Sequence, residues 1–258
     1  MPPILADLQN LALQAGEILR AGRNQHFQID HKGEIDLVTE VDRRSEAFLI
    51  GEIQRKFPHD SIIAEESGSH TGQACCCWYI DPLDGTVNYA HGVPFYCVSI
   101  AYAEEGIIRL GAVYDPVHAE LFSAEVGQGA TLNGKPLHVA GTATVDQSLL
   151  VTGFPYDIRT NPLNNLEQYR RFALRSMGVR RLGSAALDLC YVAAGRLDGF
   201  WELHLNPWDV AAGALIASQA GAVVTAASGD PDYLKTPCSA LAANHTVHAQ
   251  MLEILNQP

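Results

Sequence analysis

Apolar residues recur at helical spacing in two stretches near the start of the chain. The first stretch predicts an amphipathic helix that ends near Gly22, with apolar positions at Leu5, Leu8, Ala12, Ala15 and Leu19. In the second stretch, Thr39 can cap a helix that runs up to Pro58. We therefore expect two packing helices before most of the strands.

Short apolar runs then predict strands. Residues 61–64 form one such run, and Trp78 to Ile80 are aromatic or β-branched residues that suit a buried strand. Pro82 cannot donate to a sheet ladder, so this strand should end just after Asp81. Three further runs predict an antiparallel meander at residues 95–103, 107–114 and 120–124, with a closing turn at residues 133–135.

The pattern changes after a small and polar stretch at residues 140–148, which we interpret as a domain boundary. Beyond it, strands and helices alternate, as in α/β layering. The predicted helices cover residues 166–177, 185–194 (capped by Ser184), 207–220 and 247–255, and the predicted strands cover 179–182, 199–203, 222–225 and 239–243. We expect an N-terminal α+β domain at residues 1–145 and a C-terminal α/β domain at residues 146–258.

Composition narrows the class of protein. The chain has 258 residues, of which 47% are hydrophobic, so it can bury a substantial core. Its 17 basic and 29 acidic residues give a net charge of −12, which argues against a nucleic-acid groove and fits a protein that collects cations. The N-terminus has no basic region followed by an apolar run, and no stretch approaches the ~18 apolar residues of a membrane span. We expect a cytoplasmic protein that does not enter membranes.

The cysteines and histidines give no metal or disulfide pattern. Three of the six cysteines are adjacent, the others are scattered, and no C-x-x-C pair occurs: Cys75, Cys76, Cys77, Cys97, Cys190 and Cys238. We expect free thiols, with Cys77, Cys97 and Cys190 in the core and Cys75 and Cys76 partly exposed. The histidines fall singly.

The richest stretch chemically is WYIDPLDGTVN at residues 78–88. It places Asp81 at the tip of a strand and Asp84 three residues later, so that two carboxylates bent around one turn can share divalent cations. Hard oxygen ligands of this kind favour magnesium or manganese over zinc. Gly85 and Thr86 then open the next segment with backbone N–H groups and a hydroxyl, which can hold a phosphate at a helix N-terminus. Taken alone, the stretch also fits an ordinary acidic turn.

Two other carboxylates have a functional and a structural interpretation. Glu65 and Glu66 follow a strand in the same way as Asp81, although an isolated pair of glutamates is usually solvated. Asp209 follows Pro207 in the first turn of a predicted helix, where the helix dipole stabilises a carboxylate that has no function.

Residues 181–186 and 207–209 look like the corresponding blocks of bacterial inositol phosphatases, and four motifs in order resemble the inositol monophosphatase family, the magnesium-dependent, lithium-sensitive sugar phosphatases. The four motifs are DLVTEVD at residues 36–42, IIAEESG at 62–68, WYIDPLDGTVN at 78–88 and PWDVAAG at 207–213. The resemblance covers residues from about 36 to 244. It implies an αβαβα sandwich of the sugar phosphatase type, within the α/β class, with most of the metal ligands in the N-terminal domain. It also implies a homodimer.

The resemblance also implies a set of site residues. Glu65, Asp81 and the carbonyl of Leu83 would bind one magnesium ion, and Asp81, Asp84 and Asp209 the second, with a third, weaker ion beside Glu65. Thr86, hydrogen-bonded to Asp42, would orient the attacking water, and the N–H groups of Gly85 and Thr86 would hold the phosphate. Ser184, Ala185 and Glu202 match positions that contact inositol hydroxyls. Lys32 matches a lysine on a loop at the metal site, although the residue alone fits a plain surface lysine.

Four alternatives to these assignments exist, and the residues argue against the first of them. A phosphoaspartyl phosphatase would need D-x-D-x-T directly after a strand, whereas these aspartates are three apart with Pro82 and Leu83 between them. A binding module without turnover is a second alternative, against which the intact set of carboxylates argues. Within the family, the substrate could be an inositol phosphate, histidinol phosphate, fructose bisphosphate or a nucleotide 3′-phosphate, and Glu202 could be an exposed glutamate at a strand end.

Overall fold

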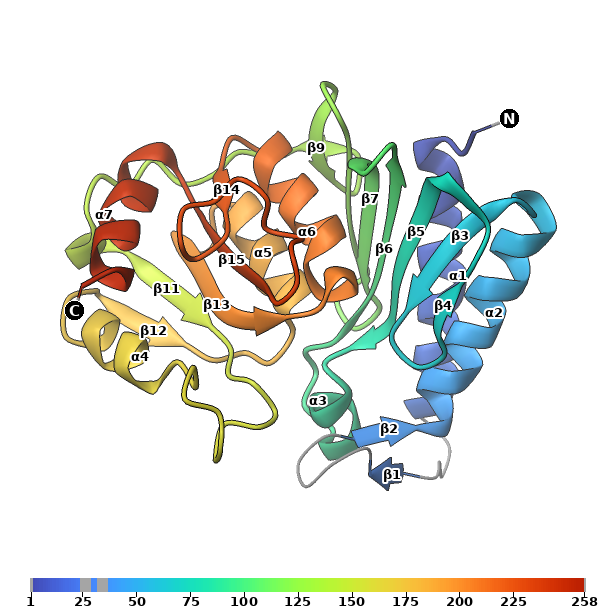
Figure 1. Cartoon of the computed structure of the whole chain (residues 1–258), viewed down its shortest axis with the longest axis horizontal. Coiled ribbons are helices and arrows are strands. Elements are labelled where there is room, and N and C mark those ends of the chain that lie inside the picture. The colour runs from blue at the N-terminus through green and yellow to red at the C-terminus, as the bar shows by residue number, and fades with distance from the viewer. Residues whose placement is uncertain (1, 24–28, 32–36, 258) are drawn as a thin grey trace.

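The computed structural model describes residues 2–23, 29–31 and 37–257, and it has five layers (Figure 1). Two helices cover the outer face of a large sheet, two more lie between that sheet and a smaller one, and a third pair covers the far face of the smaller sheet. The seven helices are α1 (Leu5–Arg23), α2 (Glu40–Lys56), α3 (Thr86–His91), α4 (Leu166–Ala173), α5 (Ala185–Ala193), α6 (Pro207–Gln219) and α7 (His245–Leu255), in the part of the chain described. This confirms the predicted αβαβα sandwich.

The large sheet has eight strands in the order β10-β9-β8-β7-β6-β5-β3-β4. All neighbours are antiparallel except β3 and β5, which are parallel. The strands are β3 (Asp60–Ala64), β4 (Gly68–His70), β5 (Gln73–Asp84), β6 (Cys97–Glu104), β7 (Ile107–Asp115), β8 (Glu120–Glu125), β9 (Gly129–Leu132) and β10 (Lys135–Pro136). The predicted meander of β6, β7 and β8 is confirmed, whereas β4, β9 and β10 were not predicted as strands.

The predicted end of β5 after Asp81 is wrong, because the strand continues through Pro82 to Asp84. Asp81 pairs with Ser99 of β6 and Asp84 pairs with Cys97, so three steps on β5 match two steps on β6. The extra residue makes a β-bulge, where a proline is tolerated because its missing N–H breaks no regular ladder. Without the bulge, two residues three apart would face opposite sides of the sheet. With it, both aspartates are paired with residues that share one face.

The smaller sheet has five strands in the order β12-β11-β13-β15-β14. They are β11 (Leu149–Thr152), β12 (Gly178–Arg180), β13 (Gly199–Leu205), β14 (Val223–Thr225) and β15 (Cys238–Ala243). β11 is parallel to β12 and to β13, whereas β15 is antiparallel to its neighbours β13 and β14. A two-stranded hairpin, β1 (Ile29–His31) and β2 (Leu37–Thr39), and a short 3-10 helix at Val145–Gln147 were not predicted.

Most of the predicted helices begin and end within one residue of the bounds that the sequence indicated, but α7 begins at His245, two residues before the predicted 247, and α4 ends early. Thr39 caps α2 through a capping box, and Ser184 caps α5 by accepting from the N–H of Leu187. The helix predicted to reach residue 177 ends instead at Ala173. The chain turns there, and the N–H of Met177 donates to the carbonyl of Ser148 on its way into β12.

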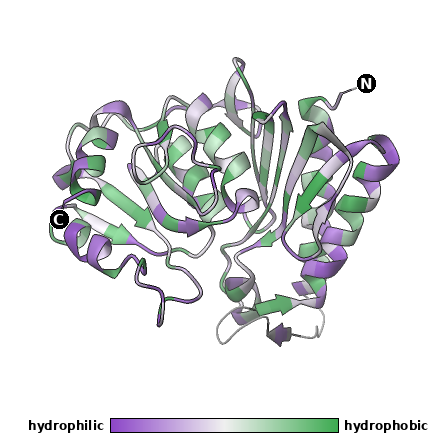
Figure 2. Ribbon diagram, in the orientation of Figure 1, coloured by the Kyte–Doolittle hydropathy of each residue, from purple (hydrophilic) through white to green (hydrophobic). Residues whose placement is uncertain are grey.

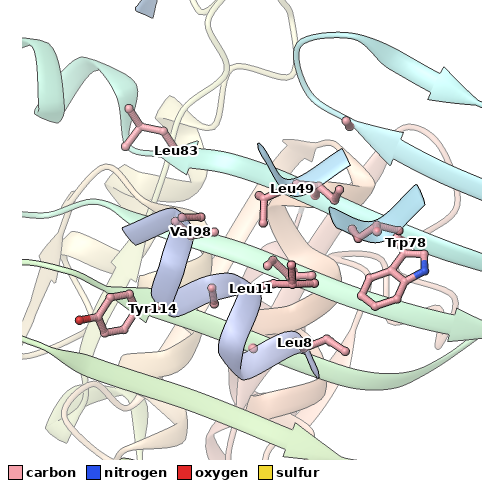
Figure 3. Close-up of a cluster of buried hydrophobic side chains, with 14 of the residues drawn as sticks. Leu8, Leu11, Leu49, Trp78, Leu83, Val98 and Tyr114 are labelled. Atoms are coloured by element: carbon pink, nitrogen blue, oxygen red, sulfur yellow. The ribbon is translucent and has the colours of Figure 1, made fainter. Parts of the chain in front are cut away.

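Apolar side chains fill the spaces between the layers. Figure 3 shows one cluster in which α1 and α2 pack on the large sheet, including the fully buried Leu8, Leu49 and Trp78. On the other face, residues of the large sheet pack with α5 and α6, and these helices also pack on the smaller sheet. In Figure 2 the polar residues concentrate on the outer helices, whereas α6 is buried all along Val210–Ala217.

The domain boundary predicted between residues 145 and 146 stays a prediction.

The cysteines are free thiols, as predicted. Cys97 and Cys190 are buried and Cys75 is exposed, also as expected, but Cys77 is only half-buried. None of the helices in the described part of the chain combines the length and apolar character that a membrane crossing requires.

Candidate active site

Asp81 lies at the centre of a group of acidic side chains. It is 2% exposed, its Oδ1 accepts a 3.0 Å hydrogen bond from the N–H of Leu83, and its carboxyl is hydrogen-bonded to that of Glu65 at the end of β3. Burial, followed by repulsion from Glu65, Asp84 and Asp209, raises the pKa of Asp81 well above its usual value. The structure therefore brings together carboxyls from three separate parts of the sequence, Glu65, the Asp81 and Asp84 pair, and Asp209.

Asp84 connects the end of β5 to the N-terminus of α5. Its Oδ2 accepts a 2.7 Å hydrogen bond from the hydroxyl of Ser184 and a 2.8 Å hydrogen bond from the N–H of Ala186. Burial raises the pKa of Asp84 to about 6, although these hydrogen bonds and the charge of Arg181 oppose the rise. Asp84 is thus fixed in place by groups about one hundred residues away.

Asp209 reaches the site from the first turn of α6. Its Oδ2 accepts a 2.7 Å hydrogen bond from the N–H of Asn206 as part of a capping box. Burial and repulsion from Glu65 raise its pKa well above the usual value, and the Asn206 hydrogen bond lowers it. Asp209 therefore has the structural role at the helix N-terminus, and it also lies close enough to Asp84 for the two carboxyls to repel each other.

A buried hydrogen-bond chain lies beside the carboxyls. The hydroxyl of Thr86 is 2.9 Å from Oδ1 of Asp42 and 3.0 Å from the carbonyl of Leu83, so two acceptors compete for its single proton. The Oδ2 of Asp42 accepts from the N–H of Thr39 at 2.9 Å and also from the Thr39 hydroxyl. Burial is the main cause of the raised pKa of Asp42, which these hydrogen bonds lower again. The hydrogen bond expected between Thr86 and Asp42 is present.

Gly85 makes the turn from β5 into α3. Its φ is +97°, a left-handed backbone conformation that residues with a side chain rarely adopt. A Cβ at this position would also lie 3.0 Å from the carbonyl oxygen of Phe95. The turn therefore requires glycine, and it places the first residues of α3 next to Asp84.

Five of the predicted site residues line one pocket of about 290 Å³. They are Asp84, Ser184, Ala185, Glu202 and Asp209. Glu65 instead lines a second pocket, with Glu66 and residues of α2, and Asp81 is buried and lines neither of these two. Lys32 lies outside the described residues.

Glu202 is not an exposed residue at a strand end. It lies within β13, is 8% exposed and faces the pocket. Burial, with a smaller contribution from the charge of Asp84, raises its pKa to about 8. A buried carboxyl of this kind is a candidate for a functional residue.

Among the pocket residues that sequence reasoning missed, two matter most for the polyol end, Asp188 and Gly153. Asp188 could have been noticed, because it is the one acidic residue in the apolar helix α5. Gly153 had no signal in the sequence. A Cβ there would lie 2.4 Å from each carboxylate oxygen of Glu202, a clash that only the folded chain reveals.

The chemistry of the carboxyls suits a hard divalent cation. Buried carboxyls that repel one another are stabilised by a cation between them, and oxygen ligands favour magnesium. Within the described part of the chain, however, no three histidine, cysteine, aspartate or glutamate side chains are grouped so that they could hold an ion as they stand. A cation bound between Glu65 and Asp81 would replace the proton of the hydrogen bond that joins these two carboxyls.

The family comparison and the similar known proteins indicate the same protein family. The inositol monophosphatase family matches residues 2–257. An inositol-1-monophosphatase of Synechocystis is 48% identical over 231 residues, which cover 88% of this chain and 80% of that protein. A protein named putative Nus factor SuhB, from Neisseria meningitidis serogroup B, is 40% identical over 99% of both chains.

The fold comparison agrees. The solved structure of an inositol monophosphatase from Anabaena (Nostoc) superposes with a TM-score of 0.88 at 42% identity, covering 97% of this chain and 94% of that one. A SuhB structure from Bartonella henselae gives a TM-score of 0.91 at 36% identity, covering 96% of both chains. From the family match over nearly the whole sequence and these relatives, we conclude that the chain belongs to the inositol monophosphatase family.

Proposed function

We propose that the protein is a magnesium-dependent phosphomonoesterase that hydrolyses myo-inositol monophosphate or a related small polyol phosphate. The observation that carries this proposal is one pocket, lined at once by the candidate metal ligands Asp84 and Asp209 and by the buried Glu202. A phosphate needs cations beside it, whereas the hydroxyls of a leaving polyol need hydrogen-bond acceptors. The two kinds of group stand in the same cavity.

The proposed ligands are those that the family resemblance implies. Glu65, Asp81 and the Leu83 carbonyl would hold one ion, and Asp81, Asp84 and Asp209 the other, with a third and weaker ion beside Glu65. Bound magnesium would supply an activated water and neutralise charge on the attacking and leaving oxygens.

Other residues would act on the water and the phosphate. The Thr86 hydroxyl donates its hydrogen bond to Asp42 or to the Leu83 carbonyl, which leaves the oxygen lone pairs of Thr86 free to accept a hydrogen bond from the attacking water. The N–H groups of Gly85 and Thr86, at the start of α3, would bind phosphate oxygens. No aspartate needs to be phosphorylated in this scheme.

Two assays test the proposal. Hydrolysis of p-nitrophenyl phosphate with and without magnesium tests whether the protein is a metal-dependent phosphatase, and no turnover in magnesium would reject it. A panel of myo-inositol 1-phosphate, histidinol phosphate, fructose 1,6-bisphosphate and a nucleotide 3′-phosphate, compared by kcat/KM, tests the substrate.

Glu202→Ala should lower kcat/KM for the inositol ester about tenfold or more, the range for a hydrogen bond to a charged group. It should impair p-nitrophenyl phosphate much less, since that leaving group has no hydroxyl.

The names of several relatives favour a second candidate. Proteins called Nus factor SuhB are 40% and 41% identical to this chain over most of its length. A Nus-factor role, or phospho-ligand binding without turnover, would not require the acidic residues that are retained here. A wild-type protein without phosphatase activity on the whole panel would favour this second role.

Four further features remain predictions. We expect a homodimer in the cytoplasm, a site that takes small phosphorylated substrates rather than nucleic acid, and inhibition by millimolar lithium. Sedimentation at several protein concentrations tests the dimer, and a lithium titration of the rate tests the inhibition.

A further inference from the structure

Asp188 is a buried carboxylic acid that lines the candidate active-site pocket. It lies in α5, one helical turn after the N-cap residue Ser184, and is 1% exposed. Its Oδ1 has no hydrogen-bond partner among the residues that the structure describes. Buried polar atoms are normally paired, so an unpaired oxygen at a pocket wall needs an explanation.

A structural role at the N-terminus of α5 does not explain the unpaired oxygen of Asp188. The Ser184 hydroxyl already accepts from the N–H of Leu187, and Asp188 is the fourth residue of the helix, beyond the capping positions. The other residues of α5 are apolar apart from Cys190 and Tyr191. Burial, together with the charges of Glu202 and Asp84, raises the pKa of Asp188 and so disfavours a stabilising charge at the helix N-terminus.

The neighbourhood of Asp188 indicates a ligand that carries hydroxyl groups. Glu202 of β13 lines the same pocket, and the absence of a side chain at Gly153 leaves room for its carboxyl. Arg181 lines the same pocket and supplies one positive charge, but Asp188, Glu202 and Asp84 outnumber it, so a phosphate is disfavoured beside Asp188. A hydroxyl both donates and accepts, and a carboxyl can match it in either protonation state.

We propose that Asp188 is a specificity-determining residue that hydrogen-bonds a hydroxyl of the polyol, so that Asp188 and Glu202 together form a subsite for two hydroxyls of the leaving group. This inference rests on the proposed function, because it assigns the phosphate to the Asp84 and Asp209 end of the pocket. Glu202 was expected from the sequence to contact the polyol, whereas Asp188 was not.

The decisive variants are Asp188→Leu and Asp188→Asn. Leucine has a similar volume, suits the apolar helix and removes both oxygens, so the protein should fold, with a Tm no lower than wild type. We expect the ratio of kcat/KM for myo-inositol 1-phosphate to that for p-nitrophenyl phosphate to fall about tenfold. Asparagine keeps a donor and an acceptor and should restore the ratio to within about threefold of wild type. If leucine does not fit, Asp188→Ala removes the same oxygens without adding volume.

Cys190→Ala is the matched control. It alters a buried side chain of the same helix that does not line the pocket, so it should leave the ratio unchanged even if it lowers stability. A wild-type ratio in Asp188→Leu, or equal losses on both substrates, would overturn the proposal.

A binding measurement separates this inference from the proposed function. Calorimetric titration with free myo-inositol, in the presence of inorganic phosphate and magnesium, needs no turnover. Wild type should bind and Asp188→Leu should bind at least about tenfold more weakly. Hydrolysis of p-nitrophenyl phosphate without myo-inositol binding would reject the inference alone, whereas the absence of both would reject the two together.

Discussion

The hydroxyl of Ser184 donates a 2.7 Å hydrogen bond to Oδ2 of Asp84, one hundred residues earlier in the chain. The same carboxylate oxygen accepts from the N–H of Ala186, so the N-terminus of α5 holds Asp84 in a fixed position. Ser184 had been expected to contact the polyol. In the structure its hydroxyl orients a candidate metal ligand, which couples the smaller-sheet half of the protein to the carboxylates of the larger sheet.

Asp81→Asn should abolish turnover and also make the metal-free protein more stable. Asparagine can keep the hydrogen bond from the Leu83 N–H, but it removes a buried acid that Glu65, Asp84 and Asp209 repel. We expect no measurable hydrolysis at any practical magnesium concentration and a higher urea midpoint than wild type in EDTA. Near wild-type activity in magnesium would contradict the role of Asp81 as a ligand shared by both ions.

Thr86→Val should reduce kcat about a hundredfold on every phosphate ester, in the range of general acid–base contributions. Valine has nearly the same shape but no hydroxyl, so the link to Asp42 is lost while the packing is kept. Thr86→Ser is the matched control because it retains the hydroxyl, and it should keep most of the activity. If the two variants were equally active, the hydrogen bond to Asp42 would have no catalytic role.

Gly153→Ala should mimic the loss of Glu202. Its Cβ would lie 2.4 Å from both oxygens of Glu202, so the carboxyl must leave its place in the pocket. We expect kcat/KM for myo-inositol 1-phosphate to fall about tenfold, with a smaller effect on p-nitrophenyl phosphate. Gly141→Ala is the control, since a Cβ there would have no neighbour within 4 Å. The prediction fails if both substrates respond alike to Gly153→Ala.

Glu202→Gln should change how stability depends on pH. Burial raises the pKa of Glu202 from 4.5 in the unfolded chain to about 8 in the folded protein, so between these values the folded state holds a proton that the unfolded state has released. Wild type therefore loses stability from this residue as the pH rises from about 4.5 to about 8, by up to about 1.4 kcal/mol per pH unit. Glutamine does not titrate, so the free energy of unfolding of the variant, relative to that of wild type, should increase as the pH rises across this range.

Urea unfolding in EDTA at pH 5, 6.5 and 8 measures the difference between Glu202→Gln and wild type. Glu125→Gln, at an exposed position at the end of β8, should retain the pH dependence of wild type. A constant difference between Glu202→Gln and wild type over the three pH values would show that Glu202 is not buried as a neutral acid.

Much of the molecule follows from local sequence signals. Thr39 and Ser184 cap their helices as predicted, because a cap depends on a side chain and the N–H groups two or three residues away. The meander of β6, β7 and β8 was equally visible, since its turns are encoded by short runs of turn-forming residues. The four motifs identified the family and the acidic residues, because ligand chemistry depends on residue type and order.

Tertiary structure decided how those residues are arranged. The bulge that puts Asp81 and Asp84 on one face of β5 depends on pairing with β6, which a proline in the sequence alone did not reveal. The burial of Glu202 and Asp188, and the need for glycine at position 153, arise only when β13, α5 and the chain after β11 meet at one pocket. The physical reason is that desolvation and steric exclusion depend on neighbours that are distant in sequence, whereas capping, turns and ligand type depend on neighbours that are close.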